Sequence, residues 1–113
     1  MNLKQVIDAL DASPLYAPSG WEELECSNIF ASDLISDILV SEGDEQLLLT
    51  SLTSPQVVRT ASLVGANAII LVHRRQTPPG MEAAARQQEL PLFRSTVTKF
   101  EACVRLGKLL EVS

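Results

Sequence analysis

The chain of 113 residues is 46% hydrophobic and 20% charged, a balance that predicts a single folded domain, 1–113, and argues against disorder. Its formal net charge of −5 has the wrong sign for a protein that binds by neutralising nucleic-acid phosphates. Apolar runs such as 68–72 fall far short of the roughly 20 residues of a membrane span, and the acidic N-terminus is unlike a signal peptide, so we expect a cytoplasmic protein with neither nucleic-acid nor membrane partners.

The first half of the chain reads as an alternation of helices and strands. Its first helix has apolar residues at i, i+3, i+4 and i+7, and the prolines and glycine that follow indicate a loop. A partial alternation of apolar and polar residues then favours a strand. Apolar residues return to helical spacing before a turn at Gly43. The expected elements are a helix at 3–10, a loop at 14–20, a strand at 24–30, a helix at 33–40 and a strand at 46–50.

The second half is more regular. Pro55 suits the first turn of a helix, because its missing N–H would be unpaired there, and Thr53 or Ser54 can cap the free amides. The expected elements are a helix at 55–64, a strand at 68–72, a helix at 81–89, a strand at 92–94 and a helix at 98–110. In the last helix we expect these residues to face inward: Phe100, Cys103, Val104, Leu106, Leu109 and Leu110.

Strands and helices that alternate at this spacing predict the fold class. They imply right-handed crossovers and strands that run mainly parallel. The continuous apolar run at 68–72 is typical of a strand that is covered on both faces. The sequence therefore predicts an α/β fold, a small three-layer sandwich with a mainly parallel sheet flanked by helices.

The two cysteines do not indicate a metal site. Cys26 and Cys103 lack CxxC spacing and have no neighbouring histidine. We expect both to be buried structural thiols, since a reducing cytosol disfavours a disulfide. No cofactor or metal is expected.

Several passages carry a resemblance to a known family. They are NIFASDLISDIL at 28–39, LLLTSLTSPQVVRTASLVGANAIILVHRR at 47–75 and PPGMEAAARQQELPLFRSTVTKFEACVRLGKLL at 78–110. Together they resemble the DRTGG domain, a small α/β module related to the N-terminal domain of HPr kinase/phosphorylase, over roughly residues 3–111. The resemblance implies a regulatory or accessory module without catalytic activity. It also implies an association with iron hydrogenase and other redox systems.

The residues themselves argue against an enzyme. A phosphate loop needs clustered glycines and a lysine, whereas the five glycines here are isolated from one another. His73 is the single histidine, so a serine triad would have one available base and no further sequence support. We therefore expect no catalytic residues.

Two aspartates, Asp33 and Asp37, fall four residues apart on one predicted helix. Asp33 stands at or near the N-terminus of that helix, where a carboxylate caps free amides and interacts well with the helix dipole. The alternative is a hard cation, but two carboxylates supply too few oxygens, and Asp44 is the only nearby addition. We interpret Asp33 as a cap and Asp37 as a solvated side chain.

Hydroxyl and basic side chains follow three of the predicted strands. Ligands of open α/β sheets bind outside the carboxyl ends of the strands, so these side chains form the candidate ligand site. The candidate residues are Thr50, Ser51, Thr53, His73, Arg74, Arg75, Ser95, Thr96 and Thr98. Hydroxyls, amide dipoles and guanidinium groups there favour an anion. The alternative is that the serines and threonines only cap helices and form turns.

The sequence thus favours a non-enzymatic regulatory module that binds a small anionic ligand, such as a nucleotide, or a partner protein. The alternative function is a structural assembly domain with no ligand, and an enzyme is the third reading. In either of the first two cases we expect a homodimer, because two-fold pairing is the commonest closed assembly.

Overall fold

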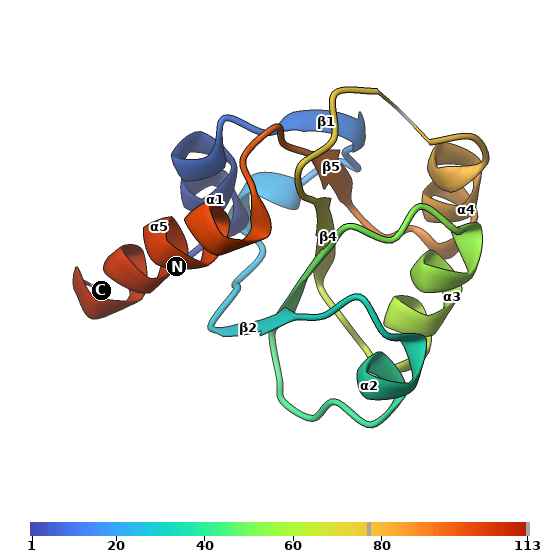
Figure 1. Cartoon of the computed structure of the whole chain (residues 1–113), viewed down its shortest axis with the longest axis horizontal. Helices are drawn as coiled ribbons and strands as arrows, with labels where there is room; N and C mark the ends of the chain where they lie inside the picture. Colours follow the sequence, from blue (N-terminus) through green and yellow to red (C-terminus); the bar gives the residue numbers. More distant parts are fainter. Residues whose placement is uncertain (77, 113) are drawn as a thin grey trace.

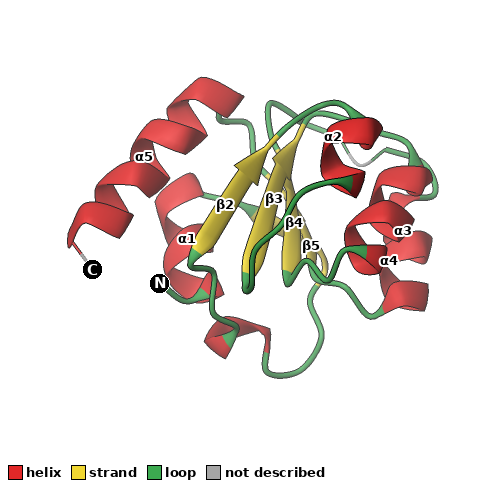
Figure 2. Ribbon diagram, turned by 90° about the horizontal axis from the view of Figure 1, so that it is seen from below, coloured by secondary structure: helices red, strands yellow, loops and turns green. Residues whose placement is uncertain are grey.

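The computed structural model describes residues 1–76 and 78–112. Within them the chain forms a five-stranded sheet in the order β1-β5-β4-β3-β2, in which only β1 runs antiparallel to its neighbour. Helices α1 and α5 cover one face of the sheet, and α2, α3 and α4 cover the other (Figures 1 and 2). The predicted three-layer α/β sandwich with a mainly parallel sheet is confirmed.

The described elements agree with most of the predicted ones. The helices are α1 Leu3–Leu10, α2 Ile35–Leu39, α3 Pro55–Leu63, α4 Met81–Gln88 and α5 Lys99–Val112, with one 3-10 turn, η1 Trp21–Glu23. The strands are β1 Ser13–Tyr16, β2 Asn28–Ala31, β3 Gln46–Thr50, β4 Ala68–Leu71 and β5 Leu92–Arg94.

The central strands divide the core between the two layers of helices. Leu47 and Ile70 point to the layer of α1 and α5, and their neighbours Leu48 and Ile69 point to the layer of α2, α3 and α4. Every residue of β3 and β4 is buried, which is why both strands read as continuous apolar runs. The two central strands are therefore covered on both faces, and their pairing holds the ends of β3 and β4 side by side.

Local capping fixes where the helices begin. Asn2 accepts a hydrogen bond from the backbone N–H of Gln5 and the Gln5 side chain accepts one in return, which forms a capping box for α1. Ser54 caps α3 by accepting from the N–H of Gln56, and Pro55 occupies the first turn as expected. Of the two caps that the sequence left open, Ser54 takes the role.

The edge strands depart from the prediction. Residues 14–16, predicted as part of a loop, belong to β1, which pairs antiparallel with β5. Pro14 is tolerated there because an edge strand leaves one side of its backbone unpaired. The strand expected at 24–30 is shorter and later, since Trp21–Glu23 forms a 3-10 turn and β2 begins at Asn28.

The inward face of α5 was predicted correctly only in part. Leu106 is buried and Leu109 packs against the core as predicted, but Val104 and Leu110 are 37% and 38% exposed. Ala102 and Leu106 are buried against the core, whereas Phe100 is 68% exposed. Cys103 is also exposed, so the prediction of two buried thiols holds for Cys26 alone. The physical reason is that α5 carries apolar residues almost all round, and its contact with α1 selects which of them are covered.

Candidate functional site

Four parallel strands, β2 to β5, end at one edge of the sheet, which we call the carboxyl-end edge and define as residues 32–33, 51–54, 72–76 and 95–98. Backbone hydrogen bonds join its segments. The N–H of His73 donates to the carbonyl of Val97 at 2.8 Å, and the N–H of Arg74 donates to the carbonyl of Ser95 at 2.9 Å. The structure therefore brings the three predicted segments together, as the parallel topology requires.

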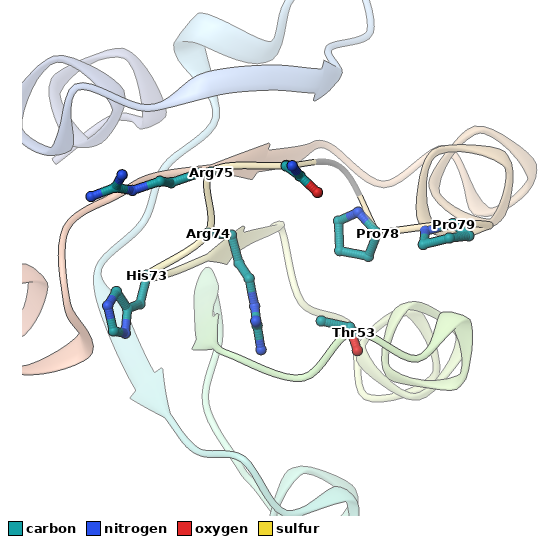
Figure 3. Close-up of a pocket in the computed structure, with 7 residues that line it drawn as sticks. Thr53, His73, Arg74, Arg75, Pro78 and Pro79 are labelled. Atoms are coloured by element: carbon teal, nitrogen blue, oxygen red, sulfur yellow. The ribbon is translucent and has the colours of Figure 1, made fainter.

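A cleft of about 420 Å³ opens at this edge (Figure 3). Its lining residues are Thr53, His73, Arg74, Arg75, Gln76, Pro78 and Pro79. The chain turns sharply at its rim, because His73 adopts a left-handed backbone with φ 57°. Figure 3 shows the result of this turn: the side chain of Arg74 points between β3 and Thr53, and those of His73 and Arg75 point to the other side. The guanidinium groups of Arg74 and Arg75 thus lie on different sides of the cleft.

Arg74 is the best positioned of these side chains. It is half-buried, and its Nη2 donates a hydrogen bond to the backbone carbonyl of Ser51. Its Nε is buried and has no hydrogen-bond partner among the described residues. A buried guanidinium N–H without a partner is costly. Arg74 also lines the cleft, so the part of its guanidinium that is exposed there can donate to an acceptor supplied by a ligand.

Asp33 lies beside this arrangement and does not cap α2. The helix begins after Leu34, whose N–H donates instead to the hydroxyl of Ser32. The Asp33 carboxylate accepts from the Ser51 N–H at 2.7 Å and also pairs with the ammonium group of Lys99. The capping interpretation of Asp33 is therefore wrong, because partners distant in sequence bind the carboxylate.

The environment of Asp33 favours its ionised form. Burial alone would raise the pKa of this carboxyl, but the hydrogen bonds from Lys99 and Ser51 outweigh it and lower the pKa from 3.8 to about 2. Asp33 also accepts from the hydroxyl of Thr50 at 3.1 Å. The carboxylate thus holds the end of β3 in place, and Lys99 neutralises its charge close to the cleft.

Three of the other predicted hydroxyls, those of Thr50, Ser95 and Thr98, have structural partners. Thr50 is buried, and Ser95 donates to the carbonyl of Leu10 at 2.7 Å. Thr98 accepts from the N–H of Glu101 at 3.2 Å, in the manner of a helix cap. Thr96 is exposed and is not among the residues that line the cleft. Four of the nine predicted residues line it, namely Thr53, His73, Arg74 and Arg75.

Sequence reasoning missed the contributions of Asp33, Lys99, Gln76, Pro78 and Pro79. Asp33 is the second residue after the end of β2, so the rule that had selected the other three strand ends would also have selected it. The signal was read as a helix cap instead. Nothing in the local sequence of Lys99 indicated that it reaches Asp33.

Positive charge concentrates at this edge although the chain is acidic overall. Of the nine lysines and arginines in the sequence, Arg74, Arg75, Arg94 and Lys99 lie at or next to it, and the Asp33 carboxylate balances Lys99, so the three arginines supply the excess positive charge. Arg94 is the last residue of β5, and its Nε is also buried without a partner among the described residues. This arrangement is suited to binding an anion, since guanidinium groups form strong, directional hydrogen bonds to phosphate and carboxylate oxygens.

Two other kinds of site find no support in the described part of the chain. No group of three or more His, Cys, Asp and Glu side chains within it is placed to hold a metal ion. None of the helices described is long and apolar enough to cross a membrane.

The comparisons with known proteins identify the fold. The sequence matches no family model and no curated protein. The structure is similar to the crystal structure of the CBS and DRTGG domains of the regulatory region of Clostridium perfringens pyrophosphatase, complexed with its activator diadenosine tetraphosphate. The TM-score is 0.68 at 11% sequence identity, and the match covers 93% of this chain and 45% of that one. The chain therefore has a fold like that of this regulatory region and spans less than half of its length.

Proposed function

We propose that this chain is a non-enzymatic regulatory module of the DRTGG type, and that it binds a small anionic ligand of the nucleotide class in the cleft beside Arg74. The observation that supports this most strongly is the Arg74 guanidinium, which is half-buried, fixed by Ser51 and left with an unpartnered Nε at the ends of parallel strands. A phosphate oxygen in the cleft would accept a hydrogen bond from the exposed part of this guanidinium.

The dimensions and polarity of the cleft support a ligand of this size. Ligand pockets commonly measure roughly 300 to 1,000 Å³, and this one measures about 420 Å³. One side carries Arg75 and His73, and the other carries Pro78, Pro79 and the start of α3. Phosphates would bind on the arginine side and a less polar group on the proline side.

The similar pyrophosphatase region adds support from its own description, which names diadenosine tetraphosphate as its activator. A dinucleotide with several phosphates has the chemistry that the arginine-rich edge favours, so we include it among the ligands to test. The association with hydrogenase or other redox systems, which the DRTGG resemblance implies, remains a prediction. So does the binding of a partner protein.

Isothermal titration calorimetry tests the proposal with diadenosine tetraphosphate, ATP and pyrophosphate as titrants. Wild type should bind at least one of them, and Arg74→Ala should weaken that binding by about 10- to 100-fold, equivalent to about 1.5–3 kcal/mol for a charge-assisted hydrogen bond. Arg59→Ala is the matched control, because it removes an equal charge from an exposed position on α3. The ligand should be recovered unchanged after incubation.

Binding that is equally strong in wild type and Arg74→Ala would contradict the site, and absence of binding to all three titrants would contradict the function. The second candidate function is an assembly domain, which the exposed apolar side chains of α5 favour. It predicts no heat of binding with any of the three anions.

A further inference from the structure

Helix α5 exposes apolar side chains on the side that faces away from the core. Phe100 is 68% and Val104 37% exposed, whereas Ala102 and Leu106 on the opposite side are buried. Phe100, Val104 and Gly107 follow at intervals of four and three residues, which is the spacing of the contact seam between paired helices. Figures 1 and 2 show α5 in the outer layer of the molecule.

Gly107 lies within this stripe without a reason in the single chain. Its backbone is not left-handed, and a Cβ added there would meet no heavy atom within 4 Å among the described residues. A glycine inside a helix is destabilising relative to alanine, so folding alone would favour another residue. A second helix that packs closely against α5 would account for it, because glycine lets helix backbones approach.

The charges beside the stripe indicate which partner fits. Glu101 and Lys108 each follow a stripe residue directly, so they lie on the same flank of α5. A two-fold axis that relates two antiparallel copies of a helix brings identical flanks together. Glu101 of each copy then lies beside Lys108 of the other copy, which forms two complementary pairs. In a parallel pair this flank would instead face the flank that carries Cys103 and Leu110.

We propose that a second copy of this chain packs antiparallel on α5, with Val104 of each copy against Gly107 of the other. The two pairings agree in register. The pairing of Val104 with Gly107 places the two-fold axis midway between residues 105 and 106, and the pairing of Glu101 with Lys108 places it midway between residues 104 and 105. None of these residues lines the Arg74 cleft, so the pairing is independent of anion binding.

Sedimentation equilibrium over a concentration series, from micromolar to submillimolar, tests the pairing. One helix pair buries less than the roughly 1,200–2,000 Å² of a standard interface, so we expect a reversible dimer of twice the 12.3 kDa chain mass. Val104→Glu should make the chain monomeric. Leu63→Glu is the matched control, since Leu63 is 78% exposed on α3, away from the stripe, and this variant should still form dimers.

Gly107→Gln separates association from folding. The substitution places a side chain in space that is open in the single chain, so it should raise the melting temperature of the monomer. The same side chain blocks close approach of a second helix and should weaken dimerisation at least tenfold. Opposite changes in the two quantities distinguish loss of the interface from loss of the fold.

Charge exchange tests the orientation. Glu101→Lys and Lys108→Glu should each weaken the dimer, and the double variant should restore it, because both pairs are re-formed with reversed signs. Glu101 also pairs with Arg105 in its own chain at 3.2 Å, so the melting temperature of each variant is measured alongside. A double variant no better than the single ones would overturn the antiparallel arrangement. A chain that stays monomeric throughout, or a dimer that is indifferent to Val104→Glu and Gly107→Gln, would overturn the proposal.

Discussion

At the carboxyl-end edge of the sheet Asp33 carries a negative charge that the protein stabilises, whereas at the opposite edge the thiol of Cys26 is held in its neutral form. Hydrogen bonds from Lys99 and Ser51 overcome the effect of burial and lower the pKa of Asp33 to about 2. Burial is the largest cause that raises the pKa of Cys26 to about 11, and the carboxylates of Glu25 and Glu45 add to it. The carboxyl-end edge therefore stabilises a negatively charged side chain, and the opposite edge disfavours one.

The clefts at the two edges show the same contrast. The second cleft, of about 320 Å³, lies at what we call the amino-end edge, which comprises residues 25–27, 44–45, 66–67 and 89–91. Its lining residues include Glu89 and no lysine or arginine. The two clefts are similar in volume, so charge and the placement of partnerless donors, not size, favour the carboxyl-end cleft as the proposed anion site.

The reactivity of the two thiols should show the largest difference. Cys26 has a pKa raised from 9.0 to about 11, which lowers its thiolate fraction near neutral pH by about 100-fold, and its burial slows attack further. Cys103 is exposed and should react with iodoacetamide as an ordinary surface thiol. Peptide mass spectrometry follows both rates, and Cys103→Ser isolates that of Cys26. Equal rates in the folded protein would show that the amino-end edge does not hold the Cys26 thiol in its neutral form.

Removing the carboxylate at the carboxyl-end edge should have the next largest effect. Asp33→Ala leaves the buried Thr50 hydroxyl without its acceptor and removes the acceptor of the Ser51 N–H, which should lower the free energy of unfolding by about 1–3 kcal/mol. Asp33→Asn keeps an acceptor and should cost less. Urea denaturation measures both variants, and Asp37→Ala on the exposed face of α2 is the control. If Asp33→Ala were as stable as Asp37→Ala, Asp33 would not organise this edge.

The smallest expected effect is a dependence of stability on acid pH. Because the folded pKa of Asp33 lies below its ordinary value, its ionised form stabilises the protein fully above about pH 3.8. That contribution is lost as the pH falls from 3.8 to about 2. The carboxylate is partly exposed and screened, so the change should be modest. The free energy of unfolding, measured against pH across this range, should change less steeply for Asp33→Asn than for wild type. Equal slopes would show that the pKa of Asp33 is not lowered in the folded protein.

The centre of the fold could be predicted from sequence, and its margins could not. Buried parallel strands such as β3 and β4 appear as continuous apolar runs, and Pro55 and Gly65 mark the ends of α3 through local backbone chemistry. The edge strand β1 reads as a loop because Pro14 is disfavoured in a central strand. The buried side of α5 depends on where α1 lies, and that information is tertiary.

The candidate site could also be predicted from the sequence only in part. The prediction that the strands run parallel was enough to bring residues 50–53, 73–75 and 95–98 to one edge. The selection of Arg74 required its contact with Ser51 and its unpartnered Nε, which only the folded chain displays. Asp33 was assigned to a helix cap because local rules cannot show its pairing with Lys99, far along the chain.

A titration followed by ¹H–¹⁵N NMR tests most directly whether the carboxyl-end cleft is the anion site. Diadenosine tetraphosphate is added to labelled wild type, and the backbone amides that shift are mapped onto the two edges. We expect the largest shifts at Thr53 and at residues 73–76, with little change at 66–67 and 89–90. Shifts confined to the amino-end edge, or no shifts at saturating ligand, would contradict the proposed function.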